Sequence, residues 1–257
     1  MWTRHDLKAK AKVAFKANYW KCVLVGFLAM LFEGAVTTSS SKQTIKDVAS
    51  GDGVHLDPGA FSPIIALAIG GSALLLVIVI IAIDIFLINP LVVGCDNFFL
   101  NNRRDSQTKV GAMSFAFSTN YKNIVKTRFM TDLFIALWTL LLIVPGIIKM
   151  YEYRMVSYIL AENPDTDYRT AMQISKSLMD GQKFNAFILD LSFILWYLLG
   201  ALTFGLVNLF YTFPYIQATN AELFIALAYP GESSVIEAGG PAVKGAETVE
   251  FTVEKNV

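Results

Sequence analysis

The sequence predicts an all-α fold, a polytopic transmembrane helix bundle of about six spans arranged as three hairpins, with five spans as the alternative. Of the 257 residues, 54% are apolar and only 16% are charged, whereas soluble domains have about 25% charged residues. The charges lie mostly outside long apolar windows, which is typical of membrane helices. A basic amphipathic stretch, an aromatic-lysine cluster and a proline-bearing apolar run also recur three times.

Each repeat opens with a predicted amphipathic helix, over residues 3–17, 108–120 and 166–180. In the first helix Leu7, Ala11 and Phe15 share one face, and lysines occupy the rest. Such helices can lie at a membrane surface, so we expect anionic headgroups at the cytoplasmic face as partners. Packing on the cytoplasmic ends of the bundle is the alternative. The clusters that follow are Asn18-Tyr19-Trp20-Lys21, Asn120-Tyr121-Lys122 and Gln182-Lys183-Phe184.

The chain reads as one integral membrane domain over residues 1–229, followed by a flexible tail over 230–257 that is rich in Gly, Glu, Val and Ser. We predict spans near 19–37, 63–89 with a continuation to 100, 124–144, 146–161, 184–203 and 206–229.

Three prolines should kink these spans: Pro90, Pro145 and Pro214. The apolar tract 61–100 would measure about 60 Å as one helix, twice the hydrocarbon thickness. We expect it to break at Asn89-Pro90, because proline lacks a backbone donor. The span 146–161 is the weakest, since Lys149, Glu152 and Arg154 interrupt it. A re-entrant or interfacial helix is the alternative there.

Charge predicts the orientation. Six Lys and Arg lie in the N-terminal segment through Lys21, six lie in 101–128 and three in 162–183, together fifteen of the twenty-one in the chain. The positive-inside rule therefore puts both termini and all three amphipathic helices on the cytoplasmic side.

Several acids fall within predicted spans, and charge in hydrocarbon is costly and often functional. Asp84, Asp132 and Asp190 would lie at a similar shallow depth, so a ring of carboxylates could form a cation or proton site. The alternative, which we favour, is local pairing, because Arg128 stands four residues before Asp132.

The densest charged cluster of an apolar segment is Lys149, Glu152 and Arg154. Glu152 can pair with Lys149 three residues earlier, whereas Arg154 would face another side of the helix. We expect a self-neutralised interfacial helix, with a headgroup site as the alternative.

Catalytic and metal-binding patterns are lacking in the sequence. The two histidines, His5 and His55, have no neighbouring nucleophile, and Cys22 and Cys95 read as buried free thiols. We expect no cofactor, no metal and no catalytic activity. The basic segments are explained by membrane orientation, so nucleic acid is not an expected partner.

The motifs of the second half, with the opening 9–21, carry a resemblance to a known family. The motifs are Pro145-Gly146-Ile147-Ile148-Lys149, Tyr158–Pro164, Ser175–Gly181, Phe187–Phe193, Leu202–Gly205 and Phe213-Pro214-Tyr215. Over most of residues 5–228 the chain resembles a family of integral membrane proteins of Gram-positive bacteria that is catalogued as a domain of unknown function. The resemblance implies a bacterial plasma membrane and no established activity.

These features predict a non-enzymatic scaffold or accessory subunit of a transport or envelope process, with a membrane protein or a second copy as partner. A small transporter or lipid-translocating protein that uses the three acids is the alternative. A lipid enzyme ranks third.

Overall fold

The computed structural model describes residues 2–28, 75, 77–105 and 108–230. Within them every regular element is helical and there is no strand, which confirms the all-α fold. The predicted outer loop 38–60 and nearly all of the predicted tail lie outside the described residues.

The described elements follow the chain in this order: α1 (Arg4–Ala17), an apolar helix over Tyr19–Leu28, the π-helical turn η1 (Asp84–Ile88), α5 (Asn89–Arg104), the 3₁₀ turn η2 (Val110–Ser114), α6 (Phe115–Ser118), α7 (Tyr121–Leu141), α8 (Ile143–Glu152), α9 (Val156–Glu162), α10 (Tyr168–Leu178), α11 (Lys183–Leu191), α12 (Ile194–Leu202), the π-helical turn η3 (Asn208–Thr212) and α13 (Phe213–Ala228).

The first amphipathic helix forms as its sequence predicts. Thr3 caps α1, and its hydroxyl accepts a hydrogen bond from the backbone N–H of Asp6 at 3.2 Å. The predicted apolar face of Leu7, Ala11 and Phe15 is buried, and α1 packs on α13. The amphipathic helix is therefore part of the core of the molecule.

Two helices of the described part are long and apolar enough to cross a membrane, Val77–Arg104 and Lys183–Leu202. Residues 206–228 are helical throughout but are not among the helices that are long and apolar enough, and the other predicted spans are shorter or broken in the described residues. The segment 146–161 falls on α8 and α9, which Tyr153, Arg154 and Met155 separate. These lengths support membrane association but not six complete spans.

Pro90 does not interrupt its helix; the departure from α geometry comes one turn earlier, in η1. Proline gives its helix no donor for the carbonyl four residues before it. That carbonyl, of Phe86, accepts a hydrogen bond from the Tyr121 hydroxyl at 2.5 Å. The lost donor is thus replaced from the next repeat, and the helix continues.

Pro214 repeats this arrangement. It follows η3, and the carbonyl four residues before it, of Phe210, accepts a hydrogen bond from the Tyr19 hydroxyl at 3.3 Å. Both donors are the tyrosines of the aromatic-lysine clusters, so this part of the repeated pattern has a structural role.

Pro145 acts differently, because the chain turns at Leu142, between α7 and α8, with φ of −156° and ψ of 137°. Pro145 then lies in the first turn of α8, where backbone N–H groups need no helical partner. The helix α7 ends three residues before the predicted limit of its span.

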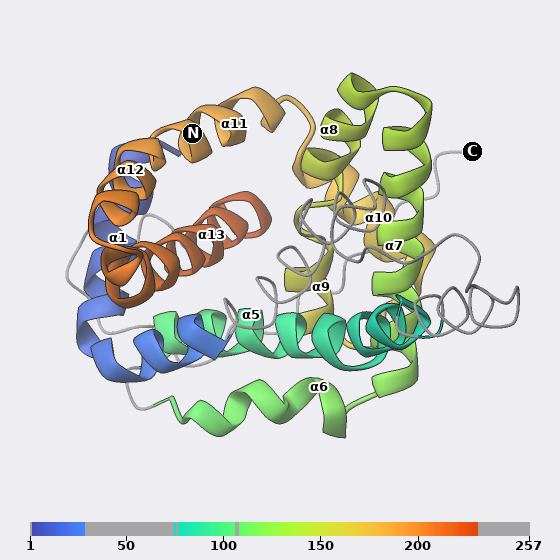
Figure 1. Cartoon of the computed structure of the whole chain (residues 1–257), viewed down its shortest axis with the longest axis horizontal. Helices are drawn as coiled ribbons and strands as arrows, with labels where there is room; N and C mark the ends of the chain where they lie inside the picture. The colour runs from blue at the N-terminus through green and yellow to red at the C-terminus, as the bar shows by residue number, and fades with distance from the viewer. Residues whose placement is uncertain (1, 29–74, 76, 106–107, 231–257) are drawn as a thin grey trace, which may run out of the picture.

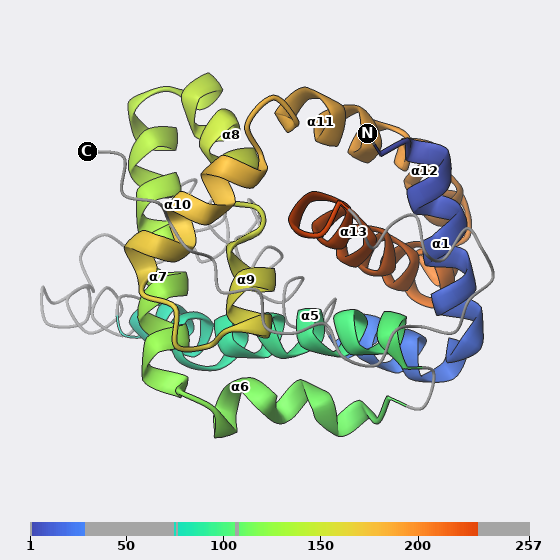
Figure 2. The same ribbon diagram turned by 180° about the vertical axis from the view of Figure 1, so that it is seen from behind.

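Each repeat packs on the next one, and the third packs on the first. The helix α7 of the second repeat packs on η1 and α5 of the first, α11 of the third packs on α8 of the second, and α1 of the first packs on α13 of the third. Figure 1 shows α1, α12, α11 and α5 around α13, and Figure 2 shows the same arrangement from behind. The first and third repeats are therefore neighbours although they are far apart in sequence.

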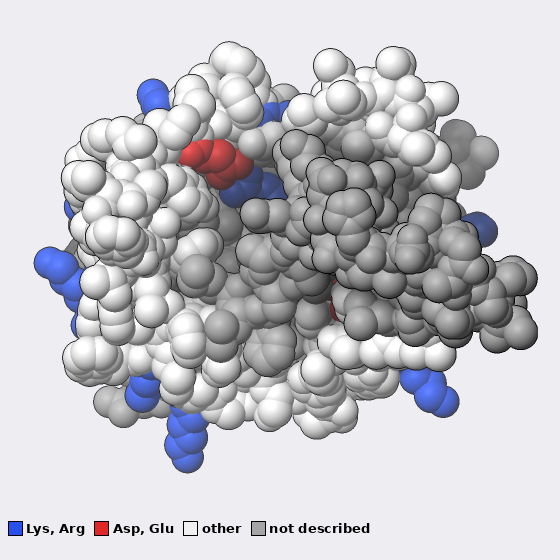
Figure 3. Space-filling view, in the orientation of Figure 1, with Lys and Arg blue, Asp and Glu red and all other residues white. Residues whose placement is uncertain are grey.

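Large apolar side chains lie at the surface of the elements that follow each cluster. The tip of the α7–α8 hairpin is a clear case, since Leu140 is 86% exposed. At the turn after α12, Phe204 is 99% exposed. On the face shown in Figure 3, uncharged side chains predominate and Lys and Arg appear mainly around the margin. This distribution is the one expected of a surface that meets lipid rather than water.

Candidate functional site

The predicted charged cluster lies at the break between α8 and α9. Ser175 of α10 satisfies the backbone on both sides of this break. Its hydroxyl donates to the carbonyl of Glu152 at 2.8 Å and accepts from the N–H of Met155 at 3.1 Å. A helix break among apolar residues needs such partners, because unpaired backbone groups are costly away from water. The break is therefore fixed in position by α10.

The Glu152 carboxylate is buried, with the side chain 4% exposed, and three lysines surround it. The ammonium of Lys149 lies 2.9 Å from the carboxylate, that of Lys183 3.2 Å and that of Lys176 4.0 Å. The pairing of Glu152 with Lys149 is the one that the sequence predicts. Lys176 and Lys183 come from α10 and from the first turn of α11, so the cluster joins three helices.

Arg154 leaves the same break on another side and holds Asp190 of α11. Its two terminal nitrogens lie 2.6 and 2.8 Å from the two carboxylate oxygens, a bidentate pair. Tyr151 donates a hydrogen bond to the same carboxylate at 2.8 Å, and Arg154 donates another to Asn220 of α13 at 2.8 Å. This network ties α8, α11 and α13 together.

Asp84 and Asp132 belong to a separate group between η1 and α7. Asn89 donates a hydrogen bond to Asp132 at 2.9 Å, and Arg128 lies 3.7 Å from the same carboxylate. The Asp84 carboxylate is near enough to interact with the charges of Asp132 and Arg128. Among the described residues, however, the Asp84 carboxylate makes no hydrogen bond or ion pair, although the Asp84 carbonyl accepts one from the backbone N–H of Asn89.

The three acids therefore do not form one ring. The structure brings Asp84 and Asp132 together and puts Asp190 with Arg154 in a different cluster. Asp132 and Asp190 each have a basic partner, as in the local-pairing interpretation. Of the five predicted polar residues, Glu152, Arg154 and Asp190 surround the α8–α9 break.

Sequence reasoning missed the ion pair between Arg103 of α5 and Glu222 of α13. Its two atoms are 2.9 Å apart, and both side chains are less than 10% exposed. The signal was present, because Glu222 is an acid within the apolar run 206–229. Membrane orientation alone accounts for Arg103 in the sequence, so the pattern does not indicate a partner for Glu222.

Burial also changes the pKa of one lysine outside the apolar helices, Lys8. The Lys8 ammonium lies 4.1 Å from the centre of the Phe193 ring and donates to the carbonyl of Ser192 at 3.4 Å. Desolvation, with smaller contributions from Arg4 and Lys12, lowers the pKa of Lys8 below its ordinary value.

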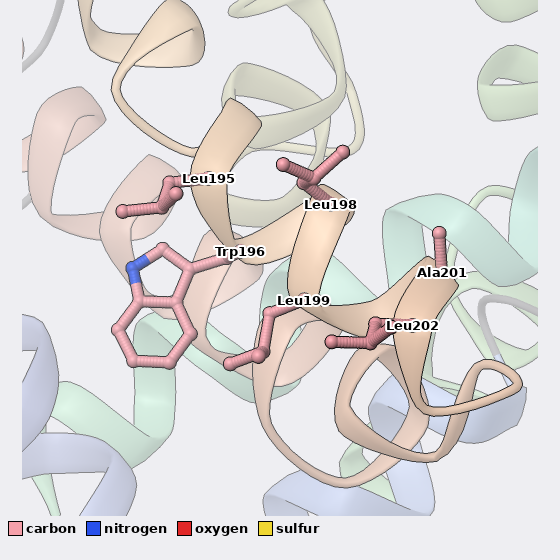
Figure 4. A pocket seen from close by; sticks show the side chains of 6 residues that line it. All are labelled: Leu195, Trp196, Leu198, Leu199, Ala201 and Leu202. Carbon is pink, nitrogen blue, oxygen red and sulfur yellow. The ribbon is translucent and has the colours of Figure 1, made fainter.

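The described residues contain no group of three or more His, Cys, Asp or Glu side chains that could hold a metal ion. An apolar hollow of about 720 Å³ lies along α12, and Figure 4 shows its lining side chains on successive turns of that helix. The lining residues are Leu195, Trp196, Leu198, Leu199, Ala201 and Leu202. This hollow suits hydrocarbon, because its described lining offers only the Trp196 indole as a polar group.

A family model described as "Protein of unknown function (DUF975)" matches residues 13–227. No curated protein and no solved structure matches the chain.

Proposed function

We propose that this chain, which belongs to the DUF975 family, is a non-enzymatic integral protein of a bacterial plasma membrane that serves as a scaffold or accessory subunit. One observation carries the proposal: two ion pairs, Arg103 with Glu222 and Arg154 with Asp190, join helices to one another, while large uncharged side chains face outward. The buried pair of Arg103 with Glu222 and the half-buried pair of Arg154 with Asp190 hold helices together. Such pairs are engaged in the structure and are therefore poorly suited to chemistry.

The partners in this proposal are anionic headgroups at the cytoplasmic face and a membrane protein or second copy of the chain. Exposed apolar surface on α7, α8 and α12 supports a partner within the bilayer as well as lipid. Affinity purification from gently solubilised membranes is expected to recover a stoichiometric partner or a homo-oligomer. Repeated recovery of the monomer alone, across several mild detergents, would contradict the scaffold proposal.

The contacts of Glu152 bear on topology. Lys176 and Lys183 belong to the basic segment that charge assigns to the cytoplasm, so Glu152, which contacts both, should lie at that level. From Glu152, the ten residues of α8 extend about 15 Å, half of the hydrocarbon thickness. This favours a re-entrant α7–α8 hairpin over two complete spans, and both termini remain cytoplasmic.

Cysteine labelling in intact cells separates the two topologies. In a chain that carries Cys22→Ser and Cys95→Ser, Leu141→Cys should resist a membrane-impermeant maleimide, because the hairpin tip stays inside the bilayer. Phe204→Cys, at the turn of the third hairpin, is the external reference and should react. Equal labelling of the two positions would favour six spans.

A second function has one observation in its favour: within the described part of the chain, the Asp84 carboxylate forms no ion pair although it lies near Asp132. It lies on a π-helical turn, a feature that is frequent at functional sites. A small transporter could bind a cation or proton there. Flux into proteoliposomes should then fall with Asp84→Asn and persist with Asp180→Asn, an exposed acid on the loop before α11. Flux that is unchanged by Asp84→Asn would remove this residue from any transport mechanism.

A further inference from the structure

We propose that the three lysines around Glu152 form a binding site for the phosphate headgroup of an anionic lipid. The inference rests on the proposed membrane location and goes beyond it, because it names one site and one class of ligand. We call Lys149, Lys176, Lys183 and Glu152 the lysine site. All contacts that form the lysine site are made within the chain itself.

The first argument is charge. Three ammonium groups face one carboxylate, so the lysine site carries a formal excess of two positive charges. The nearby Asp180 forms no ion pair among the described residues and does not offset this excess by direct contact. Lys149 and Lys183 are partly buried whereas Lys176 is exposed, so part of this excess charge is held away from water and is stabilised when an anion binds. A bound phosphate would therefore offset the excess positive charge of the lysine site.

The second argument is donor geometry. Each ammonium has three N–H donors, and one carboxylate cannot accept all nine. Lys149 and Lys183 are committed to Glu152, with side chains 21% and 31% exposed. Lys176 is 64% exposed and stands 4.0 Å from the carboxylate, beyond hydrogen-bond distance. Lys176 can thus turn to a ligand while Glu152 keeps the other two in position.

The third argument is the apolar surface beside the lysine site, which selects a lipid over a free anion. The helices α8 and α11 contact one another, and the rings of Tyr151 and Phe187 lie 6.2 Å apart. Met150 on α8 is 50% exposed, and Phe184, which follows Lys183 directly, is 69% exposed. A phosphate at the lysines would leave acyl chains against these side chains. Basic groups between membrane helices bind anionic headgroups in this way.

Trp138 provides a local reporter, because its ring centre lies 5.5 Å from the Lys149 ammonium. In a chain with Trp2→Phe, Trp20→Phe and Trp196→Phe, quenching of Trp138 by brominated phosphatidylglycerol against brominated phosphatidylcholine gives a relative binding constant. We expect the anionic lipid to be preferred. Lys176→Gln should lower the preference about fivefold, and adding Lys183→Gln should lower it about fivefold again.

The matched controls are Lys12→Gln and Lys16→Gln, exposed lysines of α1, which should leave the quenching ratio unchanged. Equal ratios in the Lys176→Gln chain and in the controls would overturn the proposal. Competition by millimolar inorganic phosphate as strong as that by phosphatidylglycerol would overturn the assignment to a lipid. Alkaline carbonate extraction of each variant separates this inference from the proposed function. A chain that resists extraction but lacks the preference refutes only the lysine site, whereas an extracted chain refutes the membrane location.

Discussion

The hydroxyl of Tyr121 should stabilise the protein only because residue 90 is a proline. It donates a 2.5 Å hydrogen bond to the Phe86 carbonyl, whose ordinary helical donor would be the N–H of residue 90. Tyr121→Phe removes the hydroxyl, and because this hydrogen bond is exposed its loss should lower the free energy of unfolding by about 0.5–1.5 kcal/mol. For a chain of this size, that corresponds to a fall in Tm of roughly 1–6 °C, from 2–4 °C for each kcal/mol.

A double-mutant cycle isolates this effect. Pro90→Ala restores a backbone N–H four residues after Phe86, so Tyr121→Phe should cost much less in the Pro90→Ala background. The coupling energy between the two substitutions should approach 1 kcal/mol or more. Both backgrounds are compared by thermal unfolding in the same detergent, followed by tryptophan fluorescence and circular dichroism.

Two results would refute the reasoning. If Tyr121→Phe lowers Tm equally in both backgrounds, the hydroxyl acts somewhere other than the Phe86 carbonyl. If it has no effect in the Pro90 protein, the bond contributes nothing. Tyr19→Phe is the parallel case at Pro214, and its longer 3.3 Å bond predicts a smaller loss.

Three further predictions use the same unfolding measurements. Asp190→Asn should lower the free energy of unfolding by about 2 kcal/mol, which is below the 3–5 kcal/mol typical of fully buried pairs because the Asp190 side chain is 36% exposed. Adding Arg154→Gln should recover part of this loss of stability. If it recovers none, the broken ion pair is not the cause of the loss. Gly94→Ala should cost at least about 1–3 kcal/mol, because an added Cβ would lie 1.9 Å from the Met113 carbonyl oxygen, whereas Gly111→Ala, with open space around it, should be near neutral; equal losses would contradict this. The pKa of Lys8 is lower in the folded protein than in the unfolded chain, so the unfolded state binds more protons as pH approaches 10.5 and the free energy of unfolding should rise with pH there. The difference in free energy of unfolding between the wild type and Lys8→Met should therefore shift in favour of the wild type from pH 8 to pH 10. A difference that stays constant over this range would refute the prediction.

The sequence predicted what depends on local pattern. The Thr3 cap and the buried face of α1 follow from spacing alone, and so does the pairing of Lys149 with Glu152 at three residues. The three-repeat pattern also pointed to the tyrosines at the starts of the apolar helices, but it did not predict that Tyr19 and Tyr121 donate to carbonyls that a proline leaves without a helical donor.

What the sequence could not predict depends on which repeats become neighbours. Asp84, Asp132 and Asp190 are expected at a similar depth in their spans. A similar depth, however, does not determine where each residue lies around the axis of the bundle. Asp190 meets Arg154 because α11 packs on α8, whereas Asp132 lies near Asp84 because α7 packs on η1. Glu222 was missed for the same reason, since its partner Arg103 lies 119 residues away in the chain.

The packing of α1 on α13 also has a consequence for biosynthesis. The first helix is synthesised some two hundred residues before α13, so the apolar face of Leu7 and Phe15 stays uncovered while the middle of the chain is made. A chain that ended before residue 213 would keep this face uncovered, and an uncovered apolar face favours aggregation.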